Sequence, residues 1–112
     1  MIIQFARGDK TVPNPTTSAI IRAGHLQDRT TIFRNDKAFA TVPHYTITNP
    51  HTFLTNIFDP TDPAATQFAF EAQQQMATFF ASDGTTTIDP DGPDPYFETP
   101  TSIVPDDLDY LP

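Results

Sequence analysis

The residues whose types and spacing come closest to a chemical site lie between Thr87 and Glu98. On a calcium-binding loop of about twelve residues, Asp89, Asp91, Gly92 and Glu98 would occupy positions 3, 5, 6 and 12. A threonine stands where the first aspartate belongs, an aspartate fills position 8, and three prolines interrupt the segment. We therefore expect a solvated acidic segment without a bound metal, and a calcium-stabilised binding module is kept as an alternative.

No other group of residues has the spacing of a catalytic or cofactor site. His25, His44 and His51 lie far apart and form no His-x-x-x-His pair. None of the serines lies in a Gly-x-Ser-x-Gly turn, and the four glycines form no phosphate-binding loop. The absence of cysteine excludes disulfides and thiolate metal sites. The sequence thus predicts a protein that is not an enzyme and has no catalytic residue, metal or cofactor.

The charges are divided sharply along the chain. All six lysines and arginines lie between Arg7 and Lys37, where three acidic residues leave a formal charge of +3 over residues 1–37. The remaining 75 residues carry eleven acidic side chains and no basic one. Protein surfaces normally mix both signs. The division suggests that the two ends face different partners, or that copies of the chain meet head to tail.

Three of the basic residues accompany aromatic side chains. Arg29, Arg34 and Lys37 lie near Phe33 and Phe39, a composition typical of weak single-stranded nucleic-acid binding. The net charge of −8 opposes such binding by the chain as a whole. We expect these charges to protect a strand edge from unwanted pairing. A small nucleic-acid-binding or regulatory module, with the acidic end as mimic or autoinhibitor, remains the alternative.

Three Asx-Pro pairs predict where helices begin, because Asn or Asp can cap a helix and Pro is tolerated in its first turn. The pair at 14–15 predicts a short helix that ends near Gly24, and the pair at 49–50 predicts about two turns before Asp59. The pair at 62–63 predicts a long helix over residues 63–81. Its expected buried stripe consists of Phe68, Ala72, Met76, Phe79 and Phe80, with the three glutamines at 73–75 mainly on the wetter side.

The segments between these helices have the composition of strands. Residues 29–33 and 38–42 flank residues 34–37, a pattern that predicts a β-hairpin. Residues 1–6 are expected to form an edge strand, residues 44–48 a continuation or a third strand, and residues 85–88 a weak final strand. The fold class predicted is therefore α+β: a small domain over residues 1–88 with a β-hairpin and two to three helices.

Residues 89–112, here called the C-terminal arm, contain six prolines, which favour an extended backbone. The arm is acidic and carries apolar side chains at intervals. We expect these side chains to fill pockets on a neighbouring subunit, and the predicted partner-binding residues are Tyr96, Phe97, Ile103, Val104, Leu108, Tyr110 and Leu111.

The function predicted is structural: an accessory or minor subunit of a larger assembly, anchored by its arm to other protein subunits or to copies of itself. Composition rich in Thr, Pro and Phe favours a virion component, such as a capsid-associated or scaffolding protein. Residues 70–80 resemble the central helix of internal scaffolding proteins of small single-stranded DNA phages, over that one helix. No apolar run approaches the ~18 residues of a membrane span, and no signal peptide is evident. The location, virion or cytoplasm, stays open.

Overall fold

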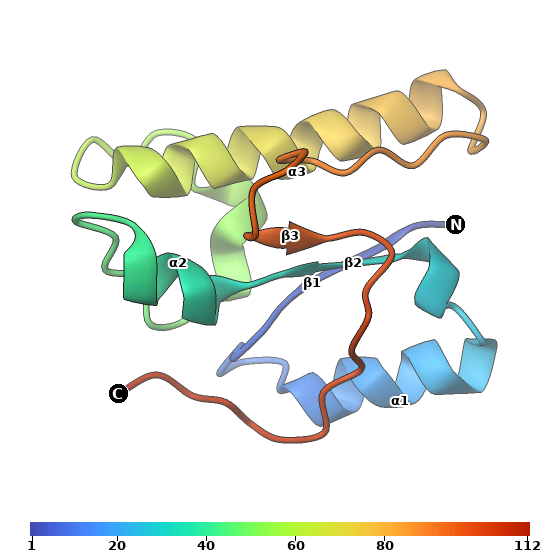
Figure 1. The fold of residues 1–112 in the computed structure, drawn as a ribbon, viewed down its shortest axis with the longest axis horizontal. Helices are drawn as coiled ribbons and strands as arrows, with labels where there is room; N and C mark the ends of the chain where they lie inside the picture. Colours follow the sequence, from blue (N-terminus) through green and yellow to red (C-terminus); the bar gives the residue numbers. More distant parts are fainter.

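The chain forms a three-stranded sheet with helices on both faces (Figure 1). The computed structural model describes residues 1–112. The elements follow the order β1 (Ile3–Ala6), α1 (Asn14–Gly24), the 3-10 helix η1 (Gln27–Arg29), β2 (Thr30–Phe33), α2 (Asn35–Thr41), the 3-10 helix η2 (Pro50–Thr55), α3 (Pro63–Ala81) and β3 (Phe97–Glu98). The predicted α+β class is therefore confirmed.

The central strand β2 has a neighbour on each side. It pairs in parallel with β1, to which α1 connects it, and antiparallel with β3. Phe5 lies opposite Ile32, and Ala6 lies opposite Phe33. Because alternate side chains point to opposite faces of a sheet, the first pair faces α1 and the second pair faces α3.

The larger core lies between the sheet and α3, and it is mostly aromatic. The ring of Phe33 lies 5.2 Å from that of Phe53, 5.1 Å from that of Phe68 and 5.1 Å from that of Phe97, between centroids. Each such ring pair stabilises the fold by about 0.5–1.5 kcal/mol beyond burial alone. The chain thus builds its main core from four of its ten phenylalanines, together with smaller side chains.

A second, smaller core lies on the α1 side of the sheet. Phe5, Ile21 and Ile32 form it, and all three are buried. Ile103 and Val104 of the C-terminal arm pack against this group. Both cores therefore include side chains from the last sixteen residues of the chain, because Phe97 belongs to the larger one.

The predicted start of α3 is confirmed by its cap. The carboxylate of Asp62, only 2% exposed, accepts a hydrogen bond from the backbone nitrogen of Ala65 at 3.0 Å. Its second oxygen accepts one from the nitrogen of Thr46 at 3.1 Å. The predicted first helix is also confirmed: α1 ends at Gly24, and His25 follows in the left-handed conformation with φ 52°. All three Asx-Pro pairs thus lie at helix starts, with side-chain caps from Asn49 at η2 and Asp62 at α3, whereas Asn14 makes no such cap.

The predicted β-hairpin is wrong. Residues 35–41 form the helix α2, and its Ala38 is fully buried in the main core. Both edges of β2 are already paired, with β1 and β3, so the segment that follows has no free edge to join. The β-branched residues at 41 and 42 favour a strand only weakly, and burial of Ala38 outweighs that preference.

Further expectations also differ from the structure, among them the burial of Phe80, which is 71% exposed. Residues 44–48 and 85–88 form no strand, and the third strand is Phe97–Glu98, inside the segment predicted to be an arm. The second predicted helix is the 3-10 helix η2, which ends at Thr55 and leaves Phe58 85% exposed. Gln75, expected on the wetter side of α3, is fully buried.

Candidate functional site

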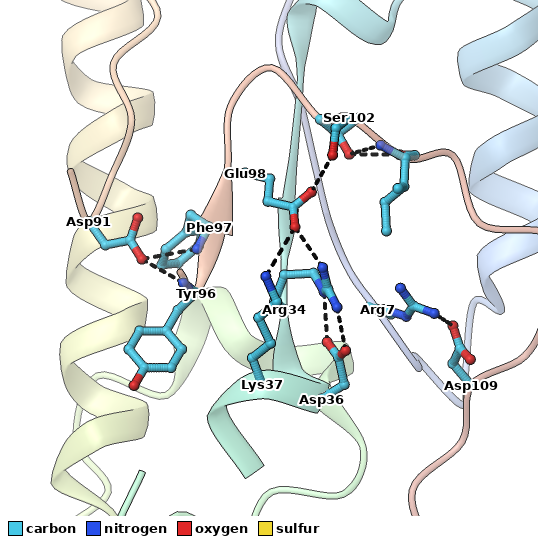
Figure 2. A network of polar contacts seen from close by, with 12 residues as sticks. Arg7, Arg34, Asp36, Lys37, Asp91, Tyr96, Phe97, Glu98, Ser102 and Asp109 are labelled. Atoms are coloured by element: carbon cyan, nitrogen blue, oxygen red, sulfur yellow. Dashed lines mark hydrogen bonds and ion pairs between the residues drawn. The ribbon is translucent and has the colours of Figure 1, made fainter. Parts of the chain in front are cut away.

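The acidic arm lies against the basic N-terminal third of the chain (Figure 2). Four of the six basic residues form ion pairs with carboxylates of residues 98–109: Arg7, Arg22, Arg34 and Lys37. The basic and acidic ends of the sequence therefore contact each other within one folded chain. The arm docks on its own domain rather than extending away from it.

Arg34 is the centre of a network of ion pairs and hydrogen bonds. Its Nη1 donates to Oε1 of Glu98 at 2.6 Å, while Nε and Nη2 donate to the two oxygens of Asp36 at 2.9 and 2.6 Å. The hydroxyl of Ser102 donates to the other oxygen of Glu98 at 3.1 Å, and Lys37 Nζ lies 3.5 Å from Oε1. Figure 2 shows how these side chains converge from α2, β3 and the arm. Paired hydrogen bonds of this kind fix geometry as well as charge.

The network holds its groups in their charged forms. Burial opposes ionisation of Asp36 and Glu98, but the hydrogen bonds and charge of Arg34 lower the pKa of both carboxyls below their usual range. The hydrogen bonds with these carboxylates raise the pKa of Arg34. None of the three is suited to exchange a proton near neutral pH. The network instead holds the arm against the rest of the chain through the ion pair between Arg34 and Glu98.

We expect Arg34→Gln to lower the free energy of unfolding by about 1–3 kcal/mol, between the values typical of exposed and buried ion pairs. Because the lowered pKa values of Asp36 and Glu98 stabilise the fold only where both are ionised, the loss should shrink as the pH falls below about 4. Urea unfolding of both proteins from pH 7 to pH 3 measures this. Arg22→Gln, which removes an exposed pair with Asp106, is the control and should cost under about 0.5 kcal/mol. An equal effect of the two variants would contradict the prediction.

The end of the arm approaches the loop after β1. Arg7 Nη2 lies 2.5 Å from Oδ2 of Asp109, and the side-chain nitrogen of Asn14 donates to the carbonyl of Asp107 at 2.9 Å. Gly8 has φ +81°, and a β-carbon there would lie 2.7 Å from the carbonyl oxygen of Asp109. Burial and the neighbouring Asp107 raise the pKa of Asp109, although the charge of Arg7 opposes this. Only glycine fits at position 8 with the arm in place.

Most residues predicted to bind a partner are covered by their own chain. Tyr96 and Phe97 pack in the main core, and Ile103 and Val104 pack in the smaller one. Leu111 is half-buried. The side chains of Leu108 and Tyr110 remain exposed, at 49% and 43%. The pockets that these residues fill in the structure are thus pockets of the same chain.

The three basic residues predicted to bind nucleic acid do not form one surface. Arg29 precedes β2 and Arg34 follows it, so the two lie at opposite ends of that strand. Arg34 is held by two carboxylates, and Lys37 lies beside Glu98. Only Arg29 among the three has no ion pair. The structure therefore brings Arg34 and Lys37 together at Glu98 and leaves Arg29 apart from them.

The carboxylates of the calcium-like segment face different partners. Asp91 accepts hydrogen bonds from the backbone nitrogens of Tyr96 and Phe97, at 2.9 and 3.0 Å, while Glu98 faces Arg34. Burial, with the nearby Asp89, raises the pKa of Asp91 to about 6. The structure contains no group of three or more histidine or carboxylate side chains placed to hold a metal ion. Asp91 fixes the turn that leads into β3.

The structure contains one acid–base pair that the sequence did not predict. His51 Nδ1 lies 2.9 Å from Oδ2 of Asp9, across 42 positions of sequence. The other oxygen of Asp9 accepts hydrogen bonds from the backbone nitrogens of Thr11 and Val12, at 2.7 and 2.9 Å. A histidine–aspartate pair could activate a serine hydroxyl, but the hydroxyls of all three serines form hydrogen bonds with other groups. The pair therefore holds the loop after β1, and no spacing signal could have revealed it.

Two cavities adjoin each other along α3 and share Gln67 and Glu71. The larger, of about 570 Å³, extends past Phe70 to Ile88, and the smaller, of about 260 Å³, reaches Tyr96. Oε1 of Glu71 accepts a hydrogen bond from Gln67 at 2.8 Å, but its buried Oε2 has no hydrogen-bond partner. Burial raises the pKa of Glu71, and the charge of Asp94 adds to the effect. Unlike Asp36, Glu98 and Asp109, this carboxylate forms no ion pair with a basic side chain.

Large apolar side chains are exposed on α3 and in the loop before it. Phe70 and Phe80 on α3 are 54% and 71% exposed, and Phe58 before it is 85% exposed. Glu71 is the sole charged residue among the nineteen of α3. No helix of the structure combines the length and the hydropathy needed to cross a bilayer.

Compared with known proteins, the chain matches no family model, no curated protein and no solved structure.

Proposed function

We propose that this chain is a non-catalytic structural subunit that works by protein–protein contact through the outer side of α3. The observation that carries the proposal is the exposure of Phe70 and Phe80 on a helix with one charged residue. A surface helix ordinarily carries charged and polar residues on its outer face. A large, nearly uncharged outer face with exposed aromatic rings is typical of a surface that another protein covers.

The arm takes a different role in this proposal from the one expected from sequence. Its ion pairs and apolar side chains complete the domain, so the contact surface lies on α3 instead. Neutralisation of four of the six basic residues disfavours nucleic acid as the partner. A particle built from many protein copies, such as a virion, is the setting we propose for the subunit, and its composition is the support for that setting.

Site-specific photo-crosslinking in cells of the source organism tests the proposal. Full-length protein would carry a photoreactive phenylalanine analogue at position 70 or at position 80, with position 110 as control. Tyr110 is also aromatic and 43% exposed, but it lies on the arm. We expect positions 70 and 80 to give the same discrete adduct, and position 110 to give none. An adduct with the mass of two chains would identify self-assembly, whereas indistinguishable products from all three positions would refute the proposal.

A further inference from the structure

The smaller cavity beside α3 combines apolar walls with unpaired negative charge. Val42, Pro43, Phe68 and Tyr96 supply the apolar lining, and the carboxylates of Glu71 and Asp94 also line it. We propose that this pocket binds the cationic side chain of a lysine or arginine from a partner protein. The inference rests on the proposed function and specifies the chemistry that the partner brings to α3.

The shape of the cavity suits a long basic side chain. Its volume of about 260 Å³ lies below that of a typical drug-sized site. Lysine and arginine bury an aliphatic stem against apolar surface while the charged group stays near polar atoms. The half-buried ring of Tyr96, which packs on Phe68 with centroids 5.1 Å apart, adds an aromatic surface that attracts cations.

The charge of the pocket has no partner within the chain. None of the six basic residues lines either cavity, and four of them are bound to other carboxylates. Oε2 of Glu71 is buried and makes no hydrogen bond. A buried carboxylate oxygen without a partner destabilises the fold, and an incoming ammonium or guanidinium group would supply the missing hydrogen bond. Charge complementarity therefore selects a cation as the occupant.

The larger cavity suggests that the cation arrives on an extended peptide. It shares Gln67 and Glu71 with the pocket and continues along α3 past Phe70 and Ile88. Residues flanking the partner's lysine or arginine would lie along this shallow groove. Its largest apolar contact would be Phe70, which is 54% exposed in the free chain.

Nuclear magnetic resonance of the full-length, nitrogen-15-labelled protein at pH 7 tests the inference. The probe is a blocked heptapeptide of serine and leucine with one central lysine, and its control contains acetyl-lysine instead. We expect the lysine peptide to shift the amide signals of residues 64–71 and of Asp94 and Tyr96, and the acetylated peptide to leave them unchanged. Glu71→Gln should weaken binding at least tenfold, since it removes the unpaired charge but keeps the helix. Asp28→Asn, an exposed change on η1, should have no effect.

A second titration separates a protein partner from a small amine. If n-butylammonium shifts the same signals at the same concentration as the peptide, the pocket is a site for free amines, and the protein source is overturned. Unchanged binding by Glu71→Gln, or no shift with either probe, would overturn the pocket itself. In that case crosslinks from positions 70 and 80 would still support the proposed function, because they do not depend on a cation.

Discussion

Replacing Phe97 by alanine is expected to lower the free energy of unfolding by about 3–5 kcal/mol, the range for a phenylalanine removed from a packed core. Phe97 is 3% exposed, and its ring lies 5.1 Å from that of Phe33 and 6.3 Å from that of Phe68. It is also one of the two residues of β3, so its side chain holds the strand that carries Glu98 to Arg34. Loss of the ring would therefore release the arm as well as open a cavity.

The matched control is Leu108→Ala, in the same arm but 49% exposed. This change should alter stability by under about 0.5 kcal/mol, as is usual for surface substitutions. Urea unfolding gives the difference directly, and for a domain of this size each 1 kcal/mol corresponds to about 4–8 °C in Tm. If both variants have the same free energy of unfolding as the wild type, the arm does not dock on its own chain in solution.

Gln75→Leu is the second change with a large expected effect, a loss of about 2–4 kcal/mol. The amide of Gln75 is fully buried and donates to the hydroxyl of Thr31 and to the carbonyl of Ile88, both at 2.7 Å. Its oxygen accepts a hydrogen bond from Gln4 at 2.7 Å. Leucine preserves much of the volume but leaves these polar groups without a partner, at about 1–3 kcal/mol for each group that water cannot reach.

The loss is limited because some partners have a second bond. Gln4 also donates to the carbonyl of Ala72 at 2.9 Å, and the hydroxyls of Thr31 and Thr99 lie 2.7 Å apart. The control is Gln74→Leu, which makes the same chemical change one position earlier, at an exposed site. Thermal unfolding of the two variants compares them. A value of Tm for Gln75→Leu within a degree of that for Gln74→Leu would show that the buried network contributes nothing.

The same glutamine shows where sequence reasoning fails for α3. The cap at Asp62, and the buried positions of Phe68, Ala72 and Phe79, were predictable because caps and helical spacing are local. Position 75 follows position 68 by seven residues, which is nearly two turns, so the spacing places Gln75 on the same face. Its polar side chain argued against burial, and the compensating partners come from residues 4, 31, 88 and 99. Such partners can be known only once the fold is known.

The remaining differences also come from contacts distant in sequence. The hairpin was wrong because β1 and β3 occupy both edges of β2, from positions 24 or more residues away from it. The acidic arm was recognised as an extended segment that needs something to hold it, but the sequence could not indicate that its own domain supplies the pockets. The cavities along α3 involve residues 41–43, 63–74 and 88–96, and no single stretch of the chain carries their pattern.

The position of the arm has a consequence for how the protein is made. Its contacts join residues at opposite ends of the chain. Asn14 donates a hydrogen bond to the carbonyl of Asp107 across 93 positions, and Ser18 donates one to the carbonyl of Pro105 across 87. A nascent chain that has left the ribosome only as far as α3 still lacks β3, Phe97 and the side chains that cover the smaller core. Contacts so distant in sequence slow folding, so we expect the domain to reach its native structure after translation has passed residue 109. Until then its apolar faces would be open to chaperones and to other unfinished chains.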